Sequence, residues 1–241
     1  MLQPGDEEWL REKHPGLTVA GEILSGSIQF KAGYDAKINQ FFSIEGDATA
    51  TSTDAVILSG TFKVRIEPRA DRSTSRLPAL YADEIGPAAN RHFNSVDKSA
   101  CLCSPLEEDE FLQPELQFRV FLEQLVIPFL YGQVYFSSYG RWPWAEYAHG
   151  ATGILEAYAK IRDQNHAEEC LRLLSQDSKW PLIRSALRQK PYIKGHGPCF
   201  CSSGDKFRRC HSAALKGALQ LQRDLNALGI VIPQTVRQGV Q

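Results

Sequence analysis

The sequence predicts an α+β protein with a mainly antiparallel sheet and flanking helices. Two observations lead to this fold class. Strand-like segments lie in the first third of the chain, and segments with helical spacing of apolar residues follow from about residue 114. The chain has 241 residues, of which 43% are hydrophobic and 23% are charged, so a normal globular core is expected. We expect a core domain over residues 1–160 and a smaller extension over residues 161–241.

The first expected elements are a short helix and a β-hairpin. Residues 5–13 predict a helix that stops before a Pro-Gly pair. Apolar residues alternate roughly over residues 17–24, and this segment is expected to pair with residues 27–30 across a turn at Ser25 and Gly26. The sheet is therefore expected to begin close to the N-terminus.

The clearest strand lies at residues 61–67, where Phe62, Val64 and Ile66 alternate with polar side chains. Residues 77–105 have few periodic features and several turn residues. A long irregular segment inside a compact domain is often functional. Functional residues are therefore expected in this segment.

The second half of the chain has helical character. Residues 114–131 carry apolar side chains at helical spacing, and Pro128 is expected to kink or end this helix. Further helices are expected at residues 144–161, 167–176, 181–189 and 212–228. Gly229 is a plausible stop for the last of them.

Composition and charge exclude several classes of function. The formal net charge is −1, and a protein that holds nucleic acid by charge is usually more basic. No apolar run approaches the roughly 20 residues that a membrane helix needs, and the acidic N-terminus lacks a secretory core. We expect a cytoplasmic protein with no nucleic-acid or membrane partner. Its six cysteines are then thiols or metal ligands rather than disulfides.

One cysteine cluster lies near the C-terminus, in a knuckle at about residues 194–212. Cys199 and Cys201 flank one residue, and after eight more residues Cys210 is followed by His211. Three thiolates and one imidazole form a ligand set that suits a closed, tetrahedral structural zinc site. The segment between them is too polar to fold alone, which favours a Zn²⁺ knuckle over free surface thiols.

This knuckle resembles the SEC-C zinc motif, a short metal-binding tail found on many unrelated proteins. The pattern of that motif is Cys-x-Cys, eight residues, and then Cys-Cys or Cys-His. Residues 202–204, Ser-Ser-Gly, stand where Gly-Ser-Gly is usual. The resemblance implies a bound zinc ion, but a zinc knuckle alone does not define a function.

A second cluster lies in the irregular segment. His92 and Asn94 precede Cys101 and Cys103. A nucleophilic cysteine needs an accessible thiolate and a group that steadies an oxyanion, and an Asn amide is a suitable donor. From this chemistry alone, a nucleophile and a pair of small buried cysteines are equally acceptable interpretations.

The same residues resemble the active site of ubiquitin-conjugating enzymes, which carry a His-Pro-Asn motif, a loop, and then the catalytic Cys followed by Leu. His92 and Asn94 match the first and third motif positions, and Cys101 with Leu102 matches the nucleophile and its neighbour. Phe93 stands in place of the motif proline, and the loop is one residue shorter. The resemblance implies a ubiquitin-conjugating-like core in which Cys101 accepts an acyl group. It also implies that Asn94 stabilises the oxyanion and that His92 is structural.

A narrower resemblance covers most of the chain. Residues 121–158 and the fused knuckle look like the ubiquitin-conjugating-like proteins of short type II CBASS anti-phage operons. The resemblance implies that the partner is a cGAS-like nucleotidyltransferase. Its C-terminal tail would form a thioester with the cysteine and then be conjugated, which would regulate cyclic-nucleotide signalling.

Other interpretations stay open at the level of sequence. A cysteine hydrolase such as a deconjugating protease would use Cys101 with His92 or His149, and His149 is expected on a buried helix face. An inert, zinc-containing binding module is a further alternative. Cys103 could resolve an acyl group or accept it, but a packed neighbour is the favoured reading. No P-loop is visible, so another protein would have to activate the carboxylate.

Overall fold

The computed structural model describes residues 2–44, 54–72, 75–86, 89–94, 96–112 and 114–234. The chain forms two compact units. The first contains residues 1–103 and 108–146, and the second contains residues 104–107 and 147–241. The sequence placed the boundary after residue 160, whereas residues 147–160 pack within the second unit.

The first unit is built on an antiparallel sheet preceded by helix α1 (Asp6–Lys13), which the sequence predicted. Its strands are β1 (Leu17–Ala20), β2 (Ile23–Asp35), β3 (Gln40–Ser43), β4 (Val56–Glu67) and β5 (Ala79–Tyr81). The strand order is β1-β2-β4-β5, and β3 pairs with β2 beyond the end of β1. The described residues confirm the predicted α+β class with an antiparallel sheet.

The first hairpin turns at a different place from the one predicted. Gly26 lies inside β2, where it pairs with Leu17, so the turn expected at Ser25 and Gly26 is wrong. Gly21, at the real turn, has φ 63°, a left-handed conformation that glycine adopts readily. At Gly26 a Cβ would lie 2.1 Å from the Gly16 carbonyl oxygen, so this glycine permits close backbone approach rather than a turn.

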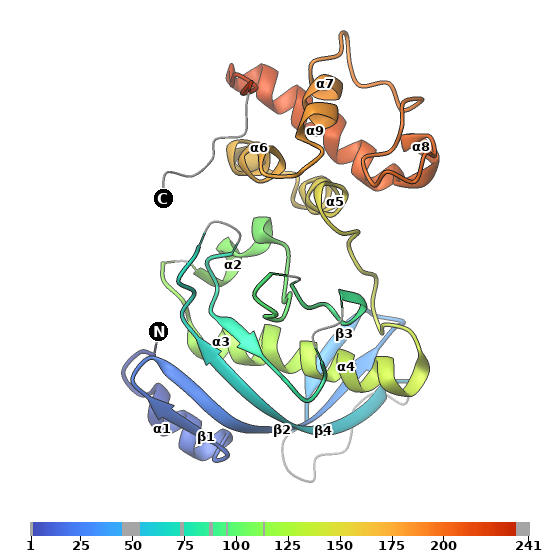
Figure 1. Cartoon of the computed structure of the whole chain (residues 1–241). Coiled ribbons are helices and arrows are strands. Elements are labelled where there is room, and N and C mark those ends of the chain that lie inside the picture. The colour runs from blue at the N-terminus through green and yellow to red at the C-terminus, as the bar shows by residue number, and fades with distance from the viewer. Residues whose placement is uncertain are drawn as a thin grey trace. The chain divides into compact units, whose positions relative to one another are not determined.

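Helices cover one face of this sheet, as Figure 1 shows for α4. After α1, the helical segments of the first unit are α2 (Asp109–Leu112), α3 (Phe118–Phe121), the π-helical segment η3 (Leu122–Val126) and α4 (Ile127–Tyr139). Short 3₁₀ turns are η1 (Ala89–Arg91) here and η2 (Pro105–Glu107) in the second unit. Fully buried apolar side chains form the centre of the core between the sheet and the helix. They are Leu24, Ile66, Leu122, Val126 and Leu130.

Pro128 does not end the long helix, so of the two predicted outcomes, a kink or an end, the end is wrong. The helix begins at Phe118, later than predicted, and continues past Pro128 to Tyr139. A proline inside a helix removes one hydrogen bond and crowds the carbonyl four residues earlier. The π-helical segment η3 ends at Val126, two residues before Pro128, and changes the bonding pattern where that crowding would occur.

The second unit is helical. It contains α5 (Ala151–Ile161), η4 (Gln164–His166), α6 (Ala167–Ser175), α7 (Trp180–Leu187), α8 (Phe207–Cys210) and α9 (Ser212–Leu228). The last helix and its stop at Gly229, which has φ 67°, are as predicted. The helix predicted from residue 144 begins only at Ala151. His149 lies before it and is exposed, so the expected buried His149 is wrong.

Helices α5 and α9 pack unusually closely. A Cβ on Gly217 would lie 1.8 Å from the Leu155 carbonyl oxygen, so only glycine fits at this crossing. Tyr158 of α5 also donates a hydrogen bond of 2.6 Å to the Asp224 carboxylate of α9. Burial, with Asp224 adding to it, raises the pKa of Tyr158, so this phenol stays protonated and remains a donor.

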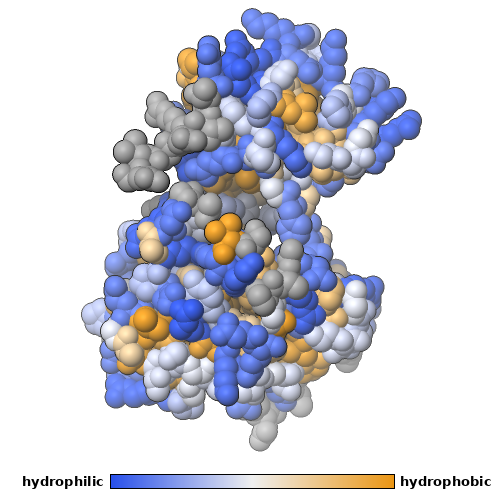
Figure 2. Space-filling model, viewed as in Figure 1, coloured by the Kyte–Doolittle hydropathy of each residue, from blue (hydrophilic) through white to orange (hydrophobic). Residues whose placement is uncertain are grey.

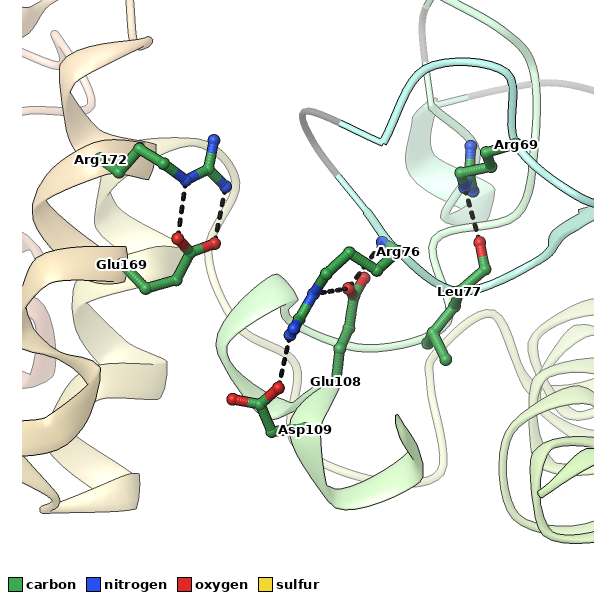
Figure 3. A network of polar contacts seen from close by, with 7 residues as sticks. All are labelled: Arg69, Arg76, Leu77, Glu108, Asp109, Glu169 and Arg172. Atoms are coloured by element: carbon green, nitrogen blue, oxygen red, sulfur yellow. Dashed lines mark hydrogen bonds and ion pairs between the residues drawn. The ribbon is translucent and has the colours of Figure 1, made fainter. Parts of the chain in front are cut away.

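The visible surface is mostly hydrophilic. Figure 2 shows scattered hydrophobic groups among mostly hydrophilic side chains. On α6, Arg172 and Glu169 form a surface ion pair of 2.6 Å, drawn in Figure 3. Within the described part of the chain, no helix is both long enough and apolar enough to cross a membrane.

The α5–α9 crossing gives a first prediction. Replacing Gly217 by alanine should destabilise the second unit by about 1–3 kcal/mol, because overpacking forces the two backbones apart. Hydrogen exchange in α5 and α9 should speed up accordingly. Lys216→Ala, on the exposed face of the same helix, is the matched control and should change exchange little. Equal exchange in Gly217→Ala and wild type would show that the crossing is not tight.

Candidate functional site

Cys101 lies at the end of a tight hairpin. Phe93 and Ala100 face each other in an isolated antiparallel bridge. The Asn94 amide donates to the Ser99 carbonyl at 2.8 Å, and the Cys101 amide donates to the His92 carbonyl at 2.7 Å. The fold therefore brings the predicted residues His92, Asn94 and Cys101 together in one hairpin.

A nearly buried arginine braces this hairpin. Arg69 follows β4, and its side chain is only 7% exposed. Its guanidinium donates to the Leu77 carbonyl at 3.1 Å, drawn in Figure 3, and to Ser99 Oγ at 2.9 Å, and it pairs with Asp97 at 2.5 Å. A buried guanidinium is stable only when its donors are satisfied, so these contacts hold the hairpin against the end of β4.

Ser99 is the centre of the hairpin's hydrogen bonds. Its buried hydroxyl accepts from Asn94 Nδ2 at 2.9 Å and from Arg69, and donates to Asp97 Oδ1 at 2.8 Å. A hydroxyl can donate one hydrogen bond and accept two, so the Ser99 hydroxyl makes all the hydrogen bonds that it can. Asn94 therefore braces the loop in this structure, and its expected oxyanion role stays a prediction.

The Asp97 carboxylate is stabilised in its charged form. Burial acts to raise the pKa of Asp97, but hydrogen bonds from Ser99 and the charge of Arg69 outweigh it, so the pKa lies below the ordinary value. A lowered pKa in the folded state contributes stability above the unfolded pKa. This contribution is lost as the pH falls through the folded pKa. The hairpin brace is thus intact at neutral pH.

The His92 ring has structural partners. Its Nε2 pairs with the Glu146 carboxylate, and its ring lies 4.5 Å from the Trp142 ring in an edge arrangement. His92 also has φ 58°, which is uncommon for a residue with a side chain. These contacts favour the structural role that the resemblance implied for His92.

The two cysteines of the cluster differ in accessibility. Cys101 is exposed, whereas Cys103 is partly buried and packs against the core of the first unit. Surrounding protein nevertheless removes water from the Cys101 thiol and raises its pKa; Arg69 lowers the pKa and Glu108 raises it further. The free protein therefore holds Cys101 mainly as a thiol at neutral pH.

Glu108 is a buried acid that sequence reasoning did not identify. It is 2% exposed, and its carboxylate accepts from the Arg76 amide at 2.8 Å, while Arg76 also pairs with Asp109 at 2.7 Å (Figure 3). Burial raises the pKa of Glu108, although hydrogen bonds and the charges of Arg76 and Arg69 oppose this. Cys101 is thus under the influence of one cation and one buried acid.

The C-terminal knuckle brings four ligand atoms together. Atoms of Cys199, Cys201, Cys210 and His211 all lie within 4.8 Å of one another. His211 Nδ1 lies 3.3 Å from Cys199 Sγ and 3.2 Å from Cys210 Sγ, and the sulfurs of Cys201 and Cys210 are 3.5 Å apart. A tetrahedral ion with bonds of about 2.0–2.3 Å would hold its ligands about 3.3–3.8 Å apart, so the cluster could bind a metal.

The local fold of the knuckle explains this convergence. Pro198 pairs with Lys206 in an antiparallel bridge, and the Cys199 amide donates to the Asp205 carbonyl at 2.9 Å. Ser202 and Gly204 have φ 66° and 84°, which lets the chain reverse sharply. This reversal of the chain brings Cys199 and Cys201 close to α8, which ends at Cys210.

Two buried aromatic rings pack against each other within the knuckle. Phe200 and Phe207 are both buried, with ring centroids 4.4 Å apart.

Burial raises the pKa of Cys199 to about 12, whereas hydrogen bonds from Ser203 lower the pKa of Cys201 to about 6. The remaining cysteine, Cys170, is buried in α6.

Comparisons with family models, with curated proteins and with solved structures find no match to this chain. The geometry itself therefore defines the sites. The first unit presents an exposed cysteine on a braced hairpin, and the second unit carries a Cys₃His cluster that could hold a metal ion.

The cluster predicts stoichiometric metal binding. Metal-replete protein should contain one transition-metal ion per chain by elemental analysis, because four ligand atoms already converge. Cys210→Ser should lose most of this ion, whereas Cys170→Ala, which alters a cysteine outside the cluster, should keep it. A wild-type protein without metal after loading would contradict the assignment.

The charges around Cys101 predict opposite effects on its reactivity. Glu108→Gln removes a negative charge, so the thiol pKa should fall and alkylation near neutral pH should become faster, because the thiolate is the reactive form. Arg69→Gln should raise the thiol pKa and slow alkylation. The rate at Cys101 can be followed against pH by peptide mass spectrometry.

The control for this pair is Arg72→Gln, an exposed cation in the loop that follows β4. It should leave the pH midpoint of Cys101 alkylation unchanged. Midpoints that move in the same direction for the Glu108 and Arg69 variants would rule out control of the thiol by these two charges.

Proposed function

We propose that the first unit is a ubiquitin-conjugating-like core and that Cys101 carries an acyl group as a thioester. The observation that supports this most strongly is the exposed Cys101 at the end of a hairpin that also contains His92 and Asn94. The Arg69 brace sets the backbone of this hairpin before a substrate arrives. Preorganisation of this kind suits acyl transfer, in which the attacking atom must be held in place.

The proposed chemistry has two steps. In the first, the Cys101 thiol loses its proton, and its sulfur attacks the carbonyl carbon of an activated acyl donor, either an acyl adenylate or another thioester. The leaving group departs and a thioester remains. In the second, an amine attacks the thioester carbonyl, the C–S bond breaks, and Cys101 is regenerated while an amide forms. The resting thiol requires that its proton be removed during the first step.

The proposed acyl group is the C-terminal tail of a cGAS-like nucleotidyltransferase, and its conjugation regulates cyclic-nucleotide anti-phage signalling in the cytoplasm. The support for this partner is the resemblance of residues 121–158 and the fused knuckle to CBASS proteins. The near-zero net charge also fits a protein partner better than a nucleic acid.

We further propose that the C-terminal cluster holds a structural zinc ion. Three sulfurs and one ring nitrogen that lie within 4.8 Å of one another supply four protein ligands, which suits zinc in a closed site. The loop between the ligands contains few apolar residues and so has little hydrophobic core of its own. Bound zinc would stabilise the knuckle by cross-linking its two ends. The SEC-C resemblance supports the same ion.

A cysteine hydrolase is supported less well. The His92 ring is held by Glu146 and Trp142. The charges that act on the Cys101 thiol come from Arg69 and Glu108 rather than from an imidazole. A hydrolase would need a histidine base at the sulfur.

The test is to trap the acyl group. When the protein is produced with the nucleotidyltransferase and its acyl-activating source, intact mass should show a thiol-labile adduct on wild-type protein. Cys101→Ser should convert it to a thiol-resistant ester or abolish it. Cys103→Ser should retain the thiol-labile adduct, because Cys103 packs against the core.

Removing the last residues of the nucleotidyltransferase is the control for tail recognition, and it should abolish the adduct. A thiol-labile adduct that survives in Cys101→Ser but is lost in Cys103→Ser would move the nucleophile to Cys103. Absence of any adduct in wild-type protein under these conditions would count against the acyl-carrier function.

A further inference from the structure

Positive charge is concentrated in one segment of the second unit. Between residues 179 and 216 the sequence has nine lysines and arginines and a single acidic residue, Asp205. The net charge of −1, from which no nucleic-acid partner was expected, is the balance of the whole chain and does not describe this segment. A basic surface on one unit can attract a polyanion even when the rest of the protein is acidic.

Three stretches of this segment meet at Gly195. The Arg208 amide donates to the Gly195 carbonyl at 3.0 Å, and a Cβ on Gly195 would lie 2.9 Å from Arg208 Cβ and 2.6 Å from the Leu215 side chain. Residues 194–197, residues 206–210 and the first turns of α9 therefore lie against one another. They carry five exposed cationic residues, which form the basic surface: Lys194, Lys206, Arg208, Arg209 and Lys216.

The cationic groups of the basic surface are available to a ligand. Within the part of the chain that the structure describes, none of the five side chains forms an ion pair or a hydrogen bond. Residues 235–241, which complete the second unit, contain no Asp or Glu. Three thiolates around a divalent ion in the neighbouring cluster would leave one negative charge, too few to offset five cations. An anion with several charges would relieve their mutual repulsion.

An exposed aromatic ring precedes the basic surface. Tyr192 is 61% exposed and lies two residues before Lys194. The next residue, Ile193, is buried, and its amide donates to the buried Gln222 side chain of α9 at 3.1 Å. The backbone is thus fixed to α9 while the Tyr192 side chain is open to solvent. A nucleic-acid base can stack on such a ring, whereas the carboxylates of an acidic peptide cannot.

We propose that the basic surface, together with Tyr192, binds single-stranded nucleic acid. The five cations would contact phosphates along the strand, and the Tyr192 ring would stack on a base. A single strand is favoured over a duplex because its unpaired bases are free to stack. The proposal goes beyond acyl transfer and does not depend on Cys101.

The test measures strand binding to the whole, metal-replete chain by fluorescence anisotropy. The probes are labelled oligothymidylate and oligouridylate, each of about 12 nucleotides. At least one should bind saturably, and its affinity should fall as salt rises because binding to phosphates releases counterions. The slope of log K against log salt should be steeper than about −2, which corresponds to roughly three phosphate contacts. Unlabelled oligoglutamate and a DNA duplex should compete poorly.

Paired charge variants test the basic surface. Lys194→Gln with Lys216→Gln removes two of its charges without altering a residue next to a metal ligand, and it should weaken strand binding by about three- to tenfold. The matched control is Lys31→Gln with Lys63→Gln, which removes two exposed charges from the sheet of the first unit. The control has the same net charge but should bind the strand as the wild type does.

Variants at Tyr192 test stacking. Tyr192→Leu should weaken strand binding by about fivefold, whereas Tyr192→Phe, which keeps the ring, should bind as the wild type does. Elemental analysis should find the same metal content in every variant, so that a loss of affinity is not a loss of the knuckle.

Failure of both strands to bind saturably would overturn the proposal. Equal affinities of the two double-lysine variants would also overturn it, because net charge rather than this surface would then control binding. Oligoglutamate that competes as well as unlabelled strand would assign the surface to acidic protein segments instead. A duplex that competes equally well, or a Tyr192→Leu variant with wild-type affinity, would contradict recognition of a single strand by stacking.

Discussion

The first unit depends on the antiparallel pairing of β2 with β4. The register runs without interruption from Leu24 opposite Ile66 to Tyr34 opposite Val56. This pairing determines where β4 ends and thus where Arg69 emerges from the sheet. The buried guanidinium must then find acceptors, and the hairpin before Cys101 supplies them. The register of the sheet therefore fixes the position of the exposed Cys101 thiol, because the buried Arg69 links the end of β4 to the hairpin before Cys101.

Several elements could be predicted from the sequence because their signals are local. Helix α9 has a regular apolar stripe and a glycine stop, and the alternation at residues 61–67 marks part of β4. The errors came from residues whose role depends on distant neighbours. Gly26 looks like a turn residue but accommodates the backbone of Gly16. Pro128 was predicted to kink or end its helix, but the helix continues past it, after a π-helical segment, to Tyr139.

The same distinction applies to the candidate sites. All four ligands of the C-terminal cluster lie within a short stretch of chain, so spacing alone predicted their convergence. Cys101, Asn94 and His92 were also close in sequence and share one hairpin. Arg69 and Glu108, which set the charge around the thiol, have no motif, and only the folded chain brings them to Cys101.

The close crossing at Gly217 has a consequence for the metal-binding cluster. His211 immediately precedes α9, so its imidazole moves with that helix, whereas Cys199 and Cys201 belong to the preceding turn. Gly217 lies on that same helix, so a looser packing of α9 on α5 would be expected to shift His211 relative to the two cysteines. Thermodynamic coupling is reciprocal: an ion that favours the present spacing of these ligands stabilises the helix crossing, and a looser crossing weakens the ion's affinity. Gly217, which has no side chain to bind an ion, would in this way contribute to the affinity of a metal held at the cluster.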